Sequence, residues 1–147
     1  MPRDYVIADT DHTSATRVEA FERARGGDMQ YTLHYLPRSR EVGQSYLSSV
    51  FTTLYALLHA CAMVLRLRPS LLLCNGPGTC IPVAAWCLWL RFAGVKRCTV
   101  VYVESIARVD SLSLSGKLLV RAADRFLVQW PQLAKKYTKA EYIGRVC

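Results

Sequence analysis

The sequence lacks the cysteine and histidine spacings that are typical of metal sites. It has no C-x-x-C pair, and its three histidines, His12, His34 and His59, are far apart along the chain. Structural zinc sites place their ligands in close pairs, so we expect no metal site. The phosphate-loop pattern G-x-x-x-x-G-K-[ST] is absent as well, which argues against an ATPase. No cofactor is expected.

Signals for secretion and for nucleic-acid binding are also missing. The opening residues Met1–Asp4 lead directly into an apolar run, without the composition of a secretory signal. No zinc-finger or aromatic RNA-binding motif occurs. Nineteen lysines and arginines against 11 acidic residues give a net charge of +8, but they form no polybasic run. This excess favours an anionic partner, such as nucleic acid, a phosphorylated metabolite or a membrane surface, without choosing among them.

Cysteine is present six times, and five of the six residues lie inside apolar segments. We expect reduced thiols in a cytosol-facing protein, because secreted disulfide frameworks pair cysteines in more polar, loop-rich chains. The length of 147 residues and the hydrophobic content of 52% fit a well-filled core. One domain over residues 1–147 is therefore expected.

Apolar segments that favour strands alternate with segments of helical spacing. We expect strands at residues 5–8, 31–35, 71–73, 98–103, 126–128 and 142–143, and helices at 14–25, 47–65, from the turn after 75 to 91, at 116–125 and from 131. The runs at 71–73 and 98–103 are continuously apolar, which is typical of strands buried on both faces of a parallel sheet. The alternation predicts an α/β fold with a parallel sheet of the nucleotide-binding type.

The turn Asn75-Gly76-Pro77-Gly78-Thr79 follows the strand expected at 71–73. Ligands of such sheets bind beyond the carboxyl ends of the strands, where loops enter helices. Gly76 and Gly78 would let a ligand approach the backbone, and Thr79 would cap the next helix, leaving N–H groups for a phosphate. A tight turn without a ligand explains the same residues equally well.

A second polar loop follows the strand expected at 98–103. Glu104 comes directly after that strand, at the same edge as the turn at 75–79, and Ser105, Arg108 and Asp110 follow closely. Glu104 could act as a base or bind a sugar hydroxyl. The alternative is a structural pair between Glu104 and Arg108.

The helix expected at 47–65 has no formal charge and approaches the length of a membrane span. Its polar residues Ser48, Ser49, Thr52, Thr53 and His59 argue against a span. We expect a helix that is buried or lies on a membrane surface. Its apolar residues at helical spacing are Val50, Leu54, Leu57, Leu58, Cys61, Val64 and Leu65. The following helix, which carries Trp86 and Trp89, is a second candidate for membrane contact.

Several motifs together resemble one family. NGPGT (75–79), VYVES (101–105), LSLSGK (112–117), VQWP (128–131) and YIGRV (142–146), with YVIADTD (5–11) and PRSREVGQS (37–45), cover nearly the whole chain in order. They look very like the anchoring subunit of the two-chain UDP-N-acetylglucosamine transferase of asparagine-linked glycosylation. That enzyme adds the second GlcNAc to dolichyl-diphosphate-GlcNAc.

The resemblance implies a Rossmann-like fold that forms the acceptor-side half of a split GT-B glycosyltransferase. The partner is then a catalytic subunit that binds UDP-GlcNAc, and the heterodimer lies on the cytosolic face of the endoplasmic reticulum membrane. From the two polar loops we expect the acceptor diphosphate to be bound by Asn75, Gly76, Gly78, Thr79, Ser105 and Arg108, with Glu104 as the catalytic candidate. The partner would contact Tyr142, Ile143, Gly144, Arg145 and Val146.

The sequence departs from the family pattern at its start. Family members begin with a hydrophobic anchor, a first strand and a G-G-H-T loop, and neither the anchor nor the loop is found in these 147 residues. We therefore expect a shortened chain that lacks the first strand and is inactive alone. Two other functions stay open: a non-enzymatic scaffold that recruits a partner to the membrane, and a basic α/β module that binds nucleotides or RNA.

Overall fold

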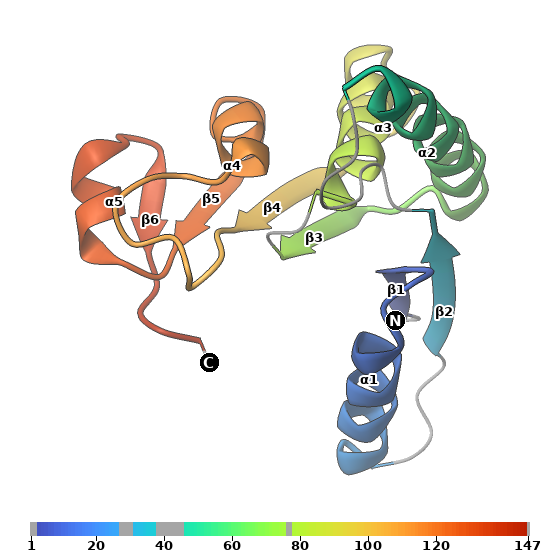
Figure 1. Ribbon diagram of the computed structural model, residues 1–147, viewed down its shortest axis with the longest axis horizontal. Coiled ribbons are helices and arrows are strands. Elements are labelled where there is room, and N and C mark those ends of the chain that lie inside the picture. The colour runs from blue at the N-terminus through green and yellow to red at the C-terminus, as the bar shows by residue number, and fades with distance from the viewer. Residues whose placement is uncertain (1–2, 27–30, 38–45, 76–77, 147) are drawn as a thin grey trace. The chain divides into compact units, whose positions relative to one another are not determined.

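The computed structural model describes residues 3–26, 31–37, 46–75 and 78–146. Helices and strands alternate along them (Figure 1). The order is β1 (Arg3–Ala8), α1 (His12–Ala24), β2 (Tyr31–Leu36), α2 (Tyr46–Leu67), β3 (Leu71–Asn75), α3 (Cys80–Phe92), β4 (Thr99–Val103), α4 (Leu114–Leu119), β5 (Arg125–Val128), α5 (Pro131–Lys136) and β6 (Ala140–Tyr142). Every strand pair is parallel. The predicted α/β class with parallel, Rossmann-like sheets is confirmed.

The chain divides into two compact units, Met1–His59 and Ala60–Cys147. In the first, β1 and β2 pair as a two-stranded sheet, and α1 packs on β1. Asp11 caps α1 by accepting a hydrogen bond from the backbone N–H of Ser14. The carboxylate of Glu22 on α1 is buried, where it accepts hydrogen bonds from Arg3 and Tyr5 of β1. These contacts fix α1 against its strand.

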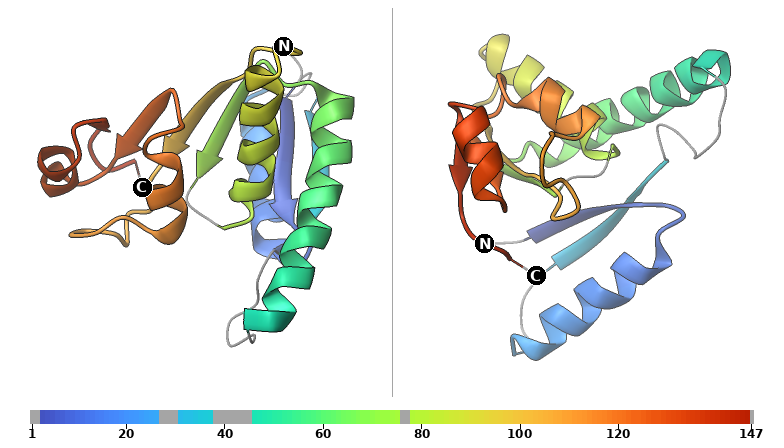
Figure 2. Two further views of the ribbon diagram at one scale, coloured as in Figure 1. Left: turned by 90° about the horizontal axis from the view of Figure 1, so that it is seen from above. Right: turned by 60° about the vertical axis from the view of Figure 1, so that its left-hand side comes forward.

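In the second unit the strand order is β3-β4-β5-β6. Each connection moves one strand in the same direction, and right-handed crossovers then place α3, α4 and α5 on one face. Figure 2 shows α3 and α4 on the same side of the sheet. The core of this unit lies beneath these helices, where Cys74, Val100, Tyr102, Phe126 and Val128 are buried. The rings of Tyr102 and Phe126 stack with centroids 5.0 Å apart.

The strand at 71–75 is less buried than predicted. Leu71 and Leu73 are 62% and 64% exposed, whereas Cys74, which points to the helical face, is buried. The one-directional strand order explains the difference, because the helices that follow β3 all cover the other face. The expectation of a strand buried on both faces is therefore wrong for β3 in this unit.

The apolar residues whose spacing predicts α2 are mostly not buried. Among its described side chains, Ala56, Ala60 and Val64 are buried, whereas Val50, Leu54, Leu58 and Leu65 are exposed. The larger apolar residues thus lie around the rest of the helix. The helix predicted at 116–125 is likewise shorter, since α4 ends at Leu119 and β5 begins at Arg125.

Candidate functional site at the carboxyl ends of the strands

The carboxyl ends of β3, β4, β5 and β6 lie along one edge of the four-stranded sheet. Asn75 pairs in register with Val103, and the strand ends continue into Glu104, into Gln129 and into the C-terminal residues 143–146. The two predicted loops and the predicted partner segment thus leave the sheet at the same edge. This edge is where α/β sheets bind their ligands.

Glu104 is the most enclosed polar residue at this edge. Its side chain is 0% exposed, and both carboxylate oxygens accept hydrogen bonds. Oε1 accepts from the backbone N–H of Ser105 at 2.9 Å, and Oε2 accepts from the backbone N–H and the hydroxyl of Ser113 at 3.0 and 3.1 Å. The partner is Ser113, so the alternative pairing with Arg108 is wrong. Glu104 closes the loop 105–112 by joining its two ends.

Ser113 links this carboxylate to the core and to α4. Its hydroxyl donates to Glu104, accepts from the backbone N–H of Gly116 at 2.9 Å, and lies 3.1 Å from the hydroxyl of Tyr102. Burial, opposed by the Ser113 hydrogen bond and assisted by the charge of Glu104, raises the pKa of Tyr102 to about 12. The tyrosine is therefore neutral at physiological pH.

Gly116 in the first turn of α4 leaves room for the carboxylate. A Cβ atom at this position would lie 2.2 Å from Oε2 of Glu104 and 3.2 Å from the Ser113 hydroxyl. No side chain larger than hydrogen fits while Glu104 keeps its hydrogen bonds. The glycine of the LSLSGK motif is thus explained by close packing on Glu104.

A third set of contacts ties the same loop to the segment after β5. The Gln129 side chain is buried and donates to the backbone carbonyl of Glu104 at 3.1 Å. The Trp130 indole donates to the carbonyl of Ile106 at 2.7 Å, and Lys136 donates to the carbonyl of Asp110 at 3.2 Å. Three side chains of residues 129–136 therefore hold the backbone of the loop.

The C-terminal residues pack on this same segment. Val146 donates its backbone N–H to Oε1 of Gln129 at 3.0 Å, and the Arg145 guanidinium lies 4.4 Å from the centre of the Trp130 ring. Ile143 donates to the carbonyl of Val128, and Gly144 takes a positive φ of 81° that turns the chain. Tyr142, Ile143 and Val146 keep exposed apolar side chains.

The turn at 75–79 agrees with its prediction in part. Thr79 is the N-cap residue of α3, but its side chain makes no capping hydrogen bond. Gly78 has no positive φ, and no described atom lies within 4 Å of the place that a Cβ would take there. Asn75 is exposed at the end of β3, and Gly76 lies outside the described residues.

Ser105 and Arg108 follow Glu104 closely in the sequence but differ from it in exposure. Arg108 is exposed, and Ser105 is half-buried, with its hydroxyl accepting from the backbone N–H of Ala107. Sequence reasoning missed Tyr102, Ser113, Gly116 and Gln129 as residues that organise this edge. Gln129 lay within the quoted VQWP stretch, but no local pattern indicates that its amide reaches residue 104.

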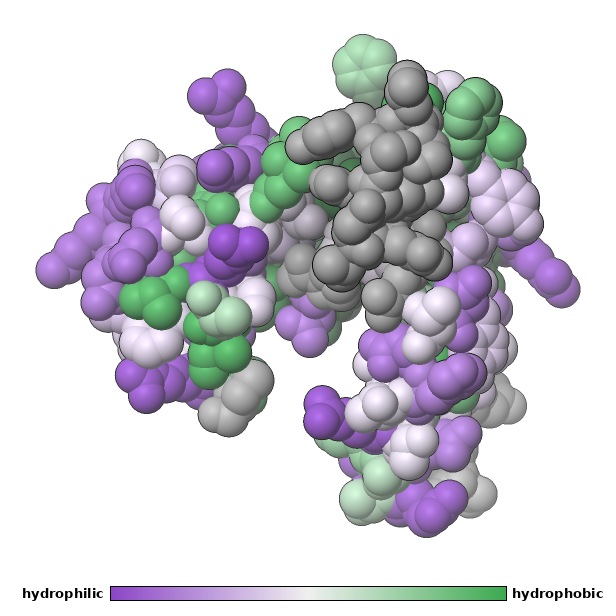
Figure 3. Space-filling view, in the orientation of Figure 1, coloured by the Kyte–Doolittle hydropathy of each residue, from purple (hydrophilic) through white to green (hydrophobic). Residues whose placement is uncertain are grey.

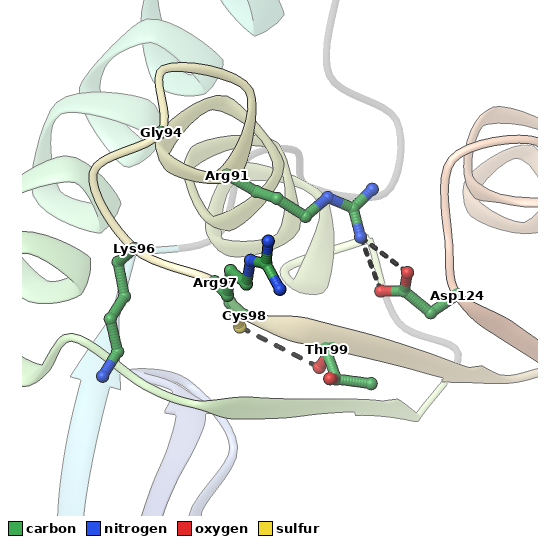
Figure 4. A pocket seen from close by; sticks show the side chains of 7 residues that line it. All are labelled: Arg91, Gly94, Lys96, Arg97, Cys98, Thr99 and Asp124. Carbon is green, nitrogen blue, oxygen red and sulfur yellow. Dashed lines mark hydrogen bonds and ion pairs between the residues drawn. The ribbon is translucent and has the colours of Figure 1, made fainter.

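A separate hollow of about 440 Å³ lies at the opposite, N-terminal end of β4 (Figure 4). Arg91 there forms two hydrogen bonds of 2.7 Å with Asp124, whose carboxylate also accepts from the backbone N–H of Val100. Lys96 and Arg97 complete its basic lining. The Arg91–Asp124 pair holds the end of α3 to the loop before β5, so this hollow is explained by structural contacts.

Residues 1–146 match the family described as "Oligosaccharide biosynthesis protein Alg14 like". The chain belongs to the Alg14 family. Curated relatives named UDP-N-acetylglucosamine transferase subunit ALG14 include the rat protein, 51% identical over 99% of this chain and 70% of its own length. The human protein is 48% identical with the same coverage, and the Schizosaccharomyces pombe protein is 42% identical over 98% of this chain and 69% of its own length. No solved structure matches the chain.

Proposed function

We propose that this chain is a subunit of the UDP-N-acetylglucosamine transferase that extends dolichyl-diphosphate-GlcNAc by a second GlcNAc. Its relatives carry the name of such a subunit at 48–51% identity over nearly the whole of this chain. The observation that carries the assignment is that the motifs of the resemblance meet in space. VYVES, LSLSGK, VQWP and YIGRV form one hydrogen-bonded set through Glu104, Ser113, Gln129 and Val146.

The lipid acceptor is proposed to bind at the carboxyl edge of the four-stranded sheet. Arg108 and Asn75 are exposed there and offer a cation and an amide to a diphosphate, and Ser105 and Thr79 lie beside them in the sequence. Gly76 and Gly78 complete the set expected from the two polar loops. The same edge carries the backbone N–H groups at the start of α3, which suit an anion.

Glu104 acts in this proposal by holding the loop that carries Arg108. Its full burial and its three accepted hydrogen bonds favour positioning, because a base must reach the acceptor hydroxyl. The catalytic role predicted for Glu104 stays a prediction. Transfer takes place in the heterodimer, with UDP-GlcNAc bound by the catalytic subunit.

Membrane contact is assigned to α2, on the cytosolic face of the endoplasmic reticulum. Within the described part of the chain, one helical stretch, Val50–Leu67, is long and apolar enough to cross a bilayer. Large apolar side chains are exposed along α2, and hydrophobic residues are seen on the surface over α2 and α3 (Figure 3). The exposed residues are Val50, Phe51, Leu54, Tyr55, Leu58 and Leu65. A helix lying in the interface buries such a surface without spanning the membrane.

The catalytic subunit is proposed to dock on the C-terminal residues Tyr142–Val146. Tyr142, Ile143 and Val146 are 52%, 41% and 65% exposed, an apolar group that a protein partner would cover. Arg145 lies beside them on Trp130, with its charge open to solvent. Recruitment and acceptor binding would thus use neighbouring surfaces.

The fold is proposed to be the acceptor-side half of a split GT-B enzyme, formed as one domain. The strand order β3-β4-β5-β6 supports this, because it is that of the second half of a doubly wound sheet.

The test is a pull-down from membranes followed by a transfer assay. The chain is co-expressed with the catalytic subunit, and GlcNAc transfer to a dolichyl-diphosphate-GlcNAc analogue is measured. Arg108→Ala should reduce acceptor use without reducing recovery of the partner. Arg121→Ala is the matched control, because Arg121 is exposed before β5, at the other end of the sheet.

The scaffold alternative makes the opposite prediction for the loop at 75–79. Gly78→Val should spare recruitment and abolish acceptor use if this loop binds the diphosphate. Normal transfer by both Gly78→Val and Arg108→Ala, with the partner still recovered, would leave recruitment as the sole function. Recovery of RNA in place of the partner would indicate the nucleic-acid alternative, provided that the RNA binding weakens steeply as the salt concentration rises.

A further inference from the structure

The loop after β4 and the C-terminal segment share one buried side chain. Gln129 donates its amide N–H to the carbonyl of Glu104 at 3.1 Å and accepts the N–H of Val146 on its oxygen at 3.0 Å. The residue is only 4% exposed, so water cannot easily replace either partner. Both ends of the Gln129 amide are therefore occupied, one by the proposed acceptor loop and one by the proposed partner segment.

The neighbouring Trp130 repeats this arrangement. Its indole N–H donates to the carbonyl of Ile106 in the loop at 2.7 Å, while the Arg145 guanidinium lies 4.4 Å from the ring centre on the C-terminal side. Two consecutive side chains thus each contact the loop with one group and the C-terminal segment with another. The segment after β5 lies between the two surfaces and touches both.

We propose that Gln129 and Trp130 are positioning residues that couple the seating of the C-terminal segment to the conformation of the acceptor loop. The inference rests on the proposed function, since it needs the loop to bind acceptor and the segment to meet the catalytic subunit. If the C-terminal segment moves away, the buried oxygen of Gln129 loses the hydrogen bond from the Val146 N–H, and the side chain rotates toward another donor. The hydrogen bond to Glu104 is then lost as well, and the loop backbone moves.

This coupling gives the two-chain enzyme a means of ordering its steps. Docking of the catalytic subunit on Tyr142–Val146 holds the segment down, which fixes Gln129 and Trp130 and hence the carbonyls of Glu104 and Ile106. The loop then has its acceptor-binding form when the partner that supplies the donor sugar is present. Binding of partner and of acceptor are each strengthened by the other, as linkage requires.

The test measures steady-state kinetics of the assembled heterodimer at saturating catalytic subunit, with a dolichyl-diphosphate-GlcNAc analogue as acceptor. Gln129→Glu keeps an oxygen for the Val146 N–H but places an oxygen against the Glu104 carbonyl. Val146→Pro removes the N–H from the other end. Each should raise the acceptor KM about tenfold, the size of one lost buried hydrogen bond, and leave the donor KM unchanged.

A matched control separates the hydrogen bonds from general damage. Gln132→Glu makes the same chemical change as Gln129→Glu, but on the exposed face of α5. It should leave the acceptor KM within about twofold of the parent value. The double variant Gln129→Glu with Val146→Pro should be no worse than either single variant, because both break one chain of contacts.

The proposal is overturned if the increases in acceptor KM caused by Gln129→Glu and Val146→Pro multiply in the double variant, or if neither variant raises the acceptor KM. It is also overturned if Gln129→Glu weakens partner affinity and donor binding as much as it weakens acceptor binding. Arg108→Ala distinguishes these failures from failure of the function. A raised acceptor KM in Arg108→Ala with a normal value in Gln129→Glu refutes the coupling alone. A normal value in both refutes the acceptor loop together with the coupling.

Discussion

Gly116→Ala tests whether the Glu104 carboxylate is held rigidly. The added Cβ would lie 2.2 Å from Oε2 and 3.3 Å from Cδ of Glu104, so the carboxylate must move. Moving it strains a packed site, which costs about 1–3 kcal/mol, and weakens hydrogen bonds to a charged group worth about 1.5–3 kcal/mol each. With partial relaxation we expect a loss of about 2–4 kcal/mol.

Thermal unfolding of the assembled heterodimer measures this loss, which corresponds to a fall in Tm of roughly 5–12 °C. Gly78→Ala is the control, because no described atom lies within 4 Å of the methyl group that it adds, and the φ of Gly78 is not positive. Combining Gly116→Ala with Glu104→Asp, which withdraws the carboxylate by one methylene, should cost less than the sum of the two changes. A Tm for Gly116→Ala equal to that of the Gly78→Ala control would refute the rigid placement of Glu104.

Three further changes probe the same unit. The pKa of Tyr102 is raised from about 10 to about 12, so its contribution to the free energy of unfolding is complete below pH 10 and is lost as the pH rises to 12. This loss amounts to up to about 3 kcal/mol, and Tyr102→Phe should remove it. Unfolding measured from pH 9 to 12 tests the prediction. Arg125→Ala breaks the exposed pair with Glu141 and should leave Tm almost unchanged; a large fall would show the pair to be structurally important. Glu104→Gln replaces one acceptor oxygen by an NH₂ group and should lower both Tm and turnover, whereas unchanged turnover would remove Glu104 from the site.

Local sequence patterns predicted which segments form strands, because strand runs and helical spacing are properties of neighbouring residues. They did not predict burial equally well. In α2 apolar residues occur on all sides, so the pattern alone could not show that Ala56, Ala60 and Val64 form the buried stripe. In β3 the exposure of Leu71 and Leu73 depends on the direction of the following crossovers, which no short window of sequence contains.

The candidate site shows the same division between local and distant information. The position of Glu104 after a buried strand, and of the turn at 75–79 after another, followed from the expected parallel sheet. The contacts of Glu104 did not, because Ser113 is nine residues away and Gln129 is 25 residues away. Arg108, four residues after Glu104, was the nearer choice of partner, but the loop carries it out to solvent.

The buried position of Glu104 bears on how an anionic acceptor could approach this edge. An exposed carboxylate would repel a diphosphate, but this one is enclosed and accepts from two backbone N–H groups and one hydroxyl. The loop after Glu104 exposes the guanidinium group of Arg108 and also the carboxylate of Asp110, and Arg145 is exposed on the C-terminal segment. In the proposed function, Arg108 and Arg145 would attract the acceptor diphosphate, while the buried Glu104 carboxylate holds the loop together. A carboxylate so enclosed has to leave its hydrogen bonds before it can take a proton from a sugar hydroxyl, so the predicted catalytic role of Glu104 would require the loop to move.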